Sequence, residues 1–177
     1  SDWDVGDPLI GRIAHSGDLA GGHAYTAALT ASLPPVRDGN WRVIVRTDLY
    51  NEVFEGNCSD AASGLALPPG EGNNHGASGS TLRVTVPELQ LGSPLATTLV
   101  AGQPALYRIA VAPGESLRVS LDAATEHGDN ELYLRFADAP SAHQFDAAHG
   151  NPVAADQQAV VSTTRAGDYY VLAQARQ

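Results

Sequence analysis

Short runs in which apolar and polar residues alternate, separated by glycine and proline, constrain this chain more than any other feature of its sequence. Eighteen glycines and eleven prolines are spread along the 177 residues. Alternation with a period of two puts successive side chains on opposite faces of a strand, and the Gly- and Pro-containing stretches between such runs are typical of turns. The pattern predicts an all-β fold. The best helix candidate, residues 141–148, is short and has no cap signal beyond Ser141.

The second half of the chain contains the clearest series of alternating runs. Strands are expected there at residues 106–111, 116–122, 131–137, 159–163 and 168–173. Strands at this spacing, with turns between them, predict two stacked sheets. Tyr169 and Tyr170 must point to opposite faces of the last strand. One of them should pack inward, and the other should be available to a neighbouring domain.

The first half carries weaker strand signals. Strands are expected at residues 9–15, 23–33, 41–46 and 81–86, and a tight turn is expected at 38–40. Trp41 should lie in the core. Residues 56–80 are rich in Gly, Asn, Ser and Pro, which predicts a long loop with one short strand at 64–67.

Pro87 and Pro94 bracket a stretch that should be short and stiff. We therefore place a domain boundary near Glu88. The expectation is two consecutive antiparallel β-sandwich domains, Ig-like or jelly-roll-like, at residues 1–88 and 89–177.

The charge balance argues against several kinds of partner. Twenty acidic and ten basic residues give a net charge of −10, and every basic residue is arginine. Such a surface repels phosphate backbones, so no nucleic-acid partner is expected. No apolar run approaches the ~20 residues that span a bilayer, so no membrane insertion is expected. Without lysine there can be no Lys–Asn isopeptide crosslink, and with Cys58 alone there can be no internal disulfide.

Several motifs of the second half, taken in order, resemble the bacterial pre-peptidase C-terminal (PPC-like) domain. The matching runs are residues 99–103, 106–109, 111–117, 131–134 and 166–171. Asn130 and Glu131 stand where that family usually has paired aspartates, which is a departure at the position of any acidic cation site. The resemblance implies a β-sandwich accessory module.

The first half resembles the cell-adhesion-related Ig-like (CARDB-like) domain of bacteria. The resemblance is carried by residues 3–7, the proline pair before Gly39, residues 47–55 and Asn73-Asn74. That family normally has a strand before the Trp-Asp segment, so the first strand is either missing or supplied by a neighbouring chain or repeat. Both resemblances imply a non-catalytic module of a secreted or cell-surface protein.

Three oxygen-rich patches are candidates for calcium, which takes six to eight oxygen ligands. The first contains Asp2, Asp4 and Asp7; the second contains Asp48, Asn51, Glu52, Glu55, Asn73 and Asn74; and the third contains Glu126, Asp129, Asn130 and Glu131. Each patch has a structural alternative, because Asp and Asn side chains also satisfy backbone groups in turns and at loop ends. No other cofactor is expected.

The sequence shows no complete catalytic constellation. Ser78 lies in Gly76-Ala77-Ser78-Gly79-Ser80, which departs from the nucleophile-elbow pattern at its last position. None of the six histidines has zinc-ligand spacing, and Cys58 has no local protease signature. An enzyme is therefore the third of three hypotheses.

The first hypothesis is a structural or adhesive repeat that assembles end to end into a fibre or array, with neighbouring repeats or copies of itself as partners. The second is an accessory binding module that tethers a secreted hydrolase to a polysaccharide or protein substrate, with a surface glycan or protein as partner. Both place the chain outside the cell. A surface aromatic platform beside polar groups would favour the second.

Overall fold

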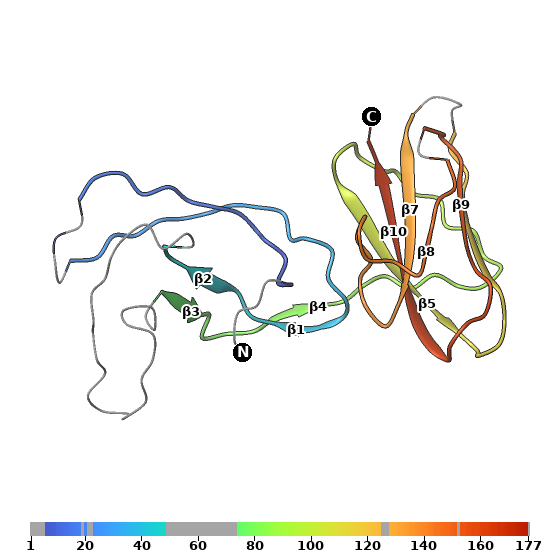
Figure 1. The fold of residues 1–177 in the computed structure, drawn as a ribbon, viewed down its shortest axis with the longest axis horizontal. Coiled ribbons are helices and arrows are strands. Elements are labelled where there is room, and N and C mark those ends of the chain that lie inside the picture. Colours follow the sequence, from blue (N-terminus) through green and yellow to red (C-terminus); the bar gives the residue numbers. More distant parts are fainter. Residues whose placement is uncertain are drawn as a thin grey trace. The chain divides into compact units, whose positions relative to one another are not determined.

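The computed structural model describes residues 6–18, 20, 23–48, 74–124, 128–151 and 153–176. Throughout this part the protein is all-β, as predicted, and its strands pair in antiparallel ladders (Figure 1). No helix occurs among the described residues, and so none is present there that could cross a membrane.

The chain divides into two compact units. One contains Ser1–Asp7 and Gly39–Val84, and the other contains Pro8–Asp38 and Thr85–Gln177. Each unit is discontinuous in sequence, whereas the expected domains are continuous segments. The chain therefore leaves the second unit after Asp38 and returns to it at Thr85.

The second unit contains two sheets (Figure 1). The larger has the order β5-β10-β7-β8, formed by β5 (Pro104–Val111), β10 (Gly167–Ala175), β7 (Asn130–Phe136) and β8 (Ala147–Ala148). The smaller pairs β6 (Leu117–Leu121) with β9 (Gln157–Val161). All five strands predicted for the second half are confirmed, with ends that differ by a few residues.

Both sheets contribute side chains to one hydrophobic core, which makes this part β-sandwich-like. Leu134 of β7 and Val171 of β10 are fully buried, and Leu117 of β6 and Ala159 of β9 meet them from the smaller sheet. In β5, Ile109 is buried in this core, and Tyr107 and Val111, two residues away on either side, pack against it. β7 and β10 are buried on both faces, at residues 132–134 and 169–173, so alternation does not separate core from surface there.

A short segment extends the larger sheet beyond β5. The backbone N–H of Arg108 donates to the carbonyl of Pro87 at 3.0 Å, and the N–H of Leu89 donates to the carbonyl of Arg108 at 2.8 Å. Glu88 thereby forms an isolated parallel bridge with Arg108. We call residues 86–90 the edge segment. It occupies part of the junction that the prolines predicted to be stiff, and it covers backbone groups that an exposed edge strand would leave unpaired.

The first unit consists of two small ladders in its described part. β1 (Gly39–Trp41) pairs with β4 (Leu82–Val84), and β2 (Ile44–Arg46) pairs with β3 (His75–Ala77). The single strand predicted at 41–46 is thus wrong, since it is interrupted at residues 42 and 43. The backbone N–H of Ser78 donates to the carbonyl of Val43 at 2.8 Å, while the Val43 N–H donates to the Ser78 hydroxyl at 3.2 Å. The Ser78 side chain replaces a ladder partner at this point.

Other predictions for the first half also need correction. Residues 9–15 and 23–33 form no strand, and Trp41 is half-buried rather than a core residue. The turn expected at 38–40 is only a bend at Asp38, with β1 following directly. β3 lies inside the predicted loop 56–80, while the strand predicted at 64–67 lies outside the described residues.

The best helix candidate, residues 141–148, forms no helix. The Ser141 hydroxyl accepts hydrogen bonds from the N–H groups of His143 and Gln144, at 3.3 and 3.1 Å. These bonds close a turn instead of capping a helix. The rest of the segment joins the sheet: the N–H of Asp146 donates to the carbonyl of Leu134 and the N–H of His149 to that of Leu132, both at 2.8 Å. Pairing with β7 outweighs the weak helical pattern, which tertiary contacts commonly do for so short a segment.

Candidate functional site

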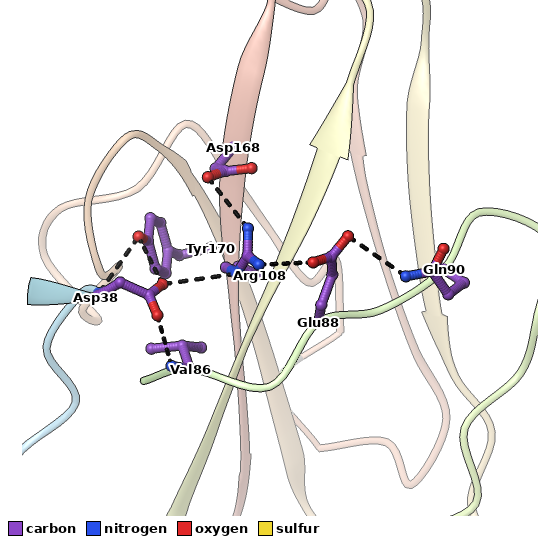
Figure 2. Close-up of polar contacts among 7 residues, drawn as sticks. All are labelled: Asp38, Val86, Glu88, Gln90, Arg108, Asp168 and Tyr170. Atoms are coloured by element: carbon purple, nitrogen blue, oxygen red, sulfur yellow. Dashed lines mark hydrogen bonds and ion pairs between the residues drawn. The ribbon is translucent and has the colours of Figure 1, made fainter. Parts of the chain in front are cut away.

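The densest polar cluster of the described residues surrounds Arg108. Arg108 alternates with the core residues Tyr107 and Ile109, so it points to the opposite face of β5. Three carboxylates lie around its guanidinium: Glu88 at 2.6 Å, Asp168 at 3.4 Å and Asp38 at 3.7 Å (Figure 2). Asp168 reaches it diagonally across the β5–β10 ladder, where Tyr170 is directly opposite Arg108.

Asp38 forms the second centre of this cluster. Its Oδ2 accepts a hydrogen bond of 3.1 Å from the Tyr170 hydroxyl, and its Oδ1 accepts one of 2.7 Å from the N–H of Val86 (Figure 2). Tyr170 and Val86 are only 5% and 4% exposed. Residue 38 ends one stretch of the second unit and residue 86 lies at the start of the next, so Asp38 joins the end of the first stretch to the start of the second. Burial raises the pKa of Tyr170, and its hydrogen bond to Asp38 raises it further.

The remaining member of the cluster lies in the edge segment. Glu88 uses Oε2 for Arg108 and accepts a hydrogen bond of 3.3 Å at Oε1 from the Gln90 amide (Figure 2). Each charged side chain drawn here therefore faces an internal partner of opposite charge or a donor. Such a cluster can hold chain segments in place, and it presents no activated nucleophile paired with a base. We call the seven residues of Figure 2 the Arg108 cluster.

The predicted calcium patch at residues 129–131 makes structural contacts. The Asn130 amide donates to the carbonyl of Ala155 at 2.6 Å, and the N–H of Arg176 donates to the carbonyl of Asp129 at 2.8 Å. Glu131 Oε2 lies 2.9 Å from Arg176 Nη2, as an ion pair without hydrogen-bond geometry. Asn130 and Glu131 are consecutive in a strand, so their side chains point to opposite faces.

The other two patches are only partly visible. Asp7 is exposed, while Asp2 and Asp4 lie outside the described residues. In the second patch Asn74 is buried, and its carbonyl accepts a hydrogen bond of 2.8 Å from the N–H of Thr47. Its other members except Asp48 lie outside the described residues, as does Glu126 of the third patch. Within the described ranges, no group of three or more His, Cys, Asp or Glu side chains is arranged to hold a metal ion.

An aromatic group lies on the outward face of β7. The Tyr133 ring is 5.5 Å from that of Phe145 and 5.1 Å, edge-on, from that of His149. Tyr133 is buried, whereas Phe145 is 46% exposed. Burial raises the pKa of Tyr133, and the carboxylate of Glu131 raises it further. An exposed ring beside polar groups is the feature expected of a binding module.

Ser78 is occupied by backbone contacts. Its hydroxyl donates to the carbonyl of Ser80 at 2.7 Å and accepts from the N–H of Val43. Arg42 donates to the carbonyl of Ser78 at 2.6 Å, which further fixes this turn. Cys58 lies outside the described residues.

Sequence reasoning missed the Arg108 cluster. The outward direction of Arg108 and of one of the two tyrosines follows from alternation, but their partners Asp38 and Glu88 carry no local signal of that role. Comparison with known proteins adds no assignment, because no family model, curated protein or solved structure matches this chain.

Proposed function

We propose that this chain is a non-catalytic structural or adhesive module of a secreted or cell-surface protein. The observation that carries the proposal is the Arg108 cluster. Each of its charged side chains contacts another member of the cluster, and these contacts tie Asp38, Val86 and the edge segment to the sheet. A reactive site would instead leave a nucleophile, base or anion-binding group facing a cavity.

The proposal includes two consecutive β-sandwich modules, an Ig-like CARDB-type module at 1–88 and a PPC-like module at 89–177. The second module is supported by the shared core of the two sheets in the second unit. The partners proposed are neighbouring repeats or further copies of the chain, packed end to end.

Light scattering after size exclusion, together with electron microscopy of the full chain at high concentration, tests this function. End-to-end packing should give oligomers or short chains whose size grows with concentration. Monomers alone at the highest concentrations would contradict an assembling role.

A second function, an accessory binding module for a polysaccharide or protein substrate, is favoured by one observation. Phe145 is exposed next to Tyr133 and His149, and an exposed aromatic ring can stack on an apolar sugar face. A glycan and collagen-peptide binding screen would detect it. Binding that is lost in Phe145→Ala and kept in Leu95→Ala, another exposed apolar residue, would replace the structural proposal by this one.

A further inference from the structure

The segment before Asp38 contains two extended runs that lie side by side without forming strands (Figure 1). A Cβ on Gly11 would lie 2.8 Å from Cδ2 of Leu29, and the rings of His15 and Tyr25 are 4.1 Å apart between centroids. These two contacts have the same antiparallel register. We call residues 9–15 and 23–33 the N-terminal ribbon.

The ribbon has one apolar face that is open to solvent. By period two, the odd-numbered residues share a face. The large ones among them are roughly half exposed: Leu9 64%, Ile13 48%, Tyr25 49%, Leu29 46% and Leu33 49%. The even-numbered positions carry Arg12, Thr26, Thr30 and Ser32 together with Ile10 and three alanines, so their face has only one large apolar side chain. A two-stranded ribbon is marginally stable at best in water, and it gains stability when its apolar face is covered.

The apolar face alternates large and small side chains in a way that matches a copy of itself. Leu29 lies over Gly11, and the same register places Ile13 opposite Ala27. Two such faces related by a two-fold axis can interdigitate, large residues against small, in an isologous dimer interface.

The charge distribution also favours a second copy of this chain as the partner. The chain carries a net charge of −10, but no Asp, Glu or Arg lies at the odd positions of the ribbon, so like charges are not brought together there.

We infer that the N-terminal ribbon is a self-association surface that packs face to face with the ribbon of a second copy. This inference rests on the proposed structural function and assigns one contact surface between copies. Because a two-fold interface closes at a dimer, end-to-end assembly needs a second surface as well. Five half-exposed apolar side chains make a patch on the order of a few hundred Å², the size that marks interaction sites. That is less than the ~800 Å² per partner of a standard interface, so the association should be weak and should depend on concentration.

Sedimentation velocity of the full chain tests the inference, from micromolar to near-millimolar concentration. The wild type should shift from monomer toward dimer, and Leu29→Glu and Ile13→Glu should each remain monomeric. Leu91→Glu is the matched control, because Leu91 is also exposed, at 63%, but lies outside the ribbon, and this variant should associate as the wild type does. Near-UV circular dichroism of each variant checks that the core around Tyr169 is intact.

Hydrogen exchange supplies a second readout that needs no substitution. Protection of residues 23–33 should rise with protein concentration. Protection that is already complete in dilute monomer would overturn the inference, because the apolar face would then be covered within one chain.

The outcomes separate the two proposals. If the wild type associates and both ribbon variants associate equally well, the ribbon is not the association surface, and the proposed assembling function stands. If dimers form through the ribbon but electron microscopy shows no larger assemblies, the surface is right and end-to-end assembly is wrong. If the wild type is monomeric throughout, both are wrong.

Discussion

The hydroxyl of Tyr170 donates a hydrogen bond of 3.1 Å to Oδ2 of Asp38, a residue 132 positions earlier in the chain. The same hydroxyl accepts a hydrogen bond of 3.3 Å from the backbone N–H of Asp38. Asp38 in turn holds the N–H of Val86. One phenol on the outward face of β10 therefore holds the two places where the chain leaves and re-enters the second unit. The outward tyrosine is thus engaged within its own chain.

Removing this hydroxyl should destabilise the second unit. We expect Tyr170→Phe to lower the free energy of unfolding by about 1–2 kcal/mol, because it deletes a partly buried hydrogen bond to a charged group. Urea denaturation followed by far-UV circular dichroism measures the change. Tyr107→Phe is the matched control, since that hydroxyl makes an exposed contact of 3.5 Å with Thr97. Equal losses in the two variants would contradict a special role for Tyr170.

Stability should fall at alkaline pH. Tyrosine has an ordinary pKa of 10.0, and burial together with the Asp38 hydrogen bond raises the pKa of Tyr170 in the native protein. Above the unfolded pKa the native state then binds more protons than the unfolded state, so the free energy of unfolding decreases as pH rises through the native pKa. Tyr170→Phe should reduce this decrease. Some should remain, because the pKa of Tyr133 is raised as well. The measurement is the urea midpoint of the wild type and of Tyr170→Phe, from neutral pH to above pH ~10. Midpoints that fall in parallel in the two proteins would contradict a contribution from Tyr170.

The ion pair between Arg108 and Glu88 should be measurably coupled. The atoms are 2.6 Å apart, and the side chains are about a third exposed. We expect a double-mutant cycle of Arg108→Gln and Glu88→Gln to give roughly 0.5–1 kcal/mol of coupling, decreasing in high salt. The pair Arg37–Asp138, 3.9 Å apart and more exposed, should give almost none. A cycle without coupling at low salt would show that the edge segment is held by its backbone bonds alone.

Asn130 should tolerate aspartate poorly. The amide donates to the carbonyl of Ala155 and is buried, whereas an ionised carboxylate has no donor and would bring a charge close to that carbonyl. We expect Asn130→Asp to cost about 1–3 kcal/mol, with or without calcium. Melting curves in EDTA and in millimolar calcium provide the measurement. If calcium rescued this variant, residues 129–131 would be a cation site after all.

The same melting curves test the patch at Asp2, Asp4 and Asp7. A rise in the wild-type melting temperature with calcium that Asp4→Asn abolishes would locate the ion there.

Gly167 should not accept a side chain. Its φ is +130°, and a Cβ would lie 3.3 Å from the ring of Phe136. We expect Gly167→Ala to cost roughly 1–3 kcal/mol, because alanine is strained at this φ and the ring must shift. Gly76→Ala is the control, since Gly76 has space around it and no positive φ; thermal unfolding should show no loss there. Comparable losses at both positions would contradict the steric argument.

Local pattern was sufficient where each strand has one buried face. Residues 106–111 and 116–122 became β5 and β6, in which alternation specifies both the strand and its register toward the core, whereas β10 is buried on both faces from Tyr169 to Ala173. In the first half the same pattern was insufficient. Residues 41–46 are broken by the Ser78 contact, and the ribbon residues keep their side-chain register without becoming strands. A short alternating run needs a hydrogen-bonded neighbour, and sequence alone does not say whether one is present.

The amino-acid sequence by itself determined that the described part of the protein is all-β and that Arg108 lies on the face of its strand opposite Tyr107 and Ile109, because these properties follow from side-chain periodicity along one strand. Only the tertiary structure decided that Asp38, Glu88, Asp168 and Tyr170 gather around that arginine. Asp38 and Tyr170 are far apart in the chain, and nothing local to either residue encodes their meeting. Their contact is made when the folded backbone brings the two crossings to the same face of the sheet.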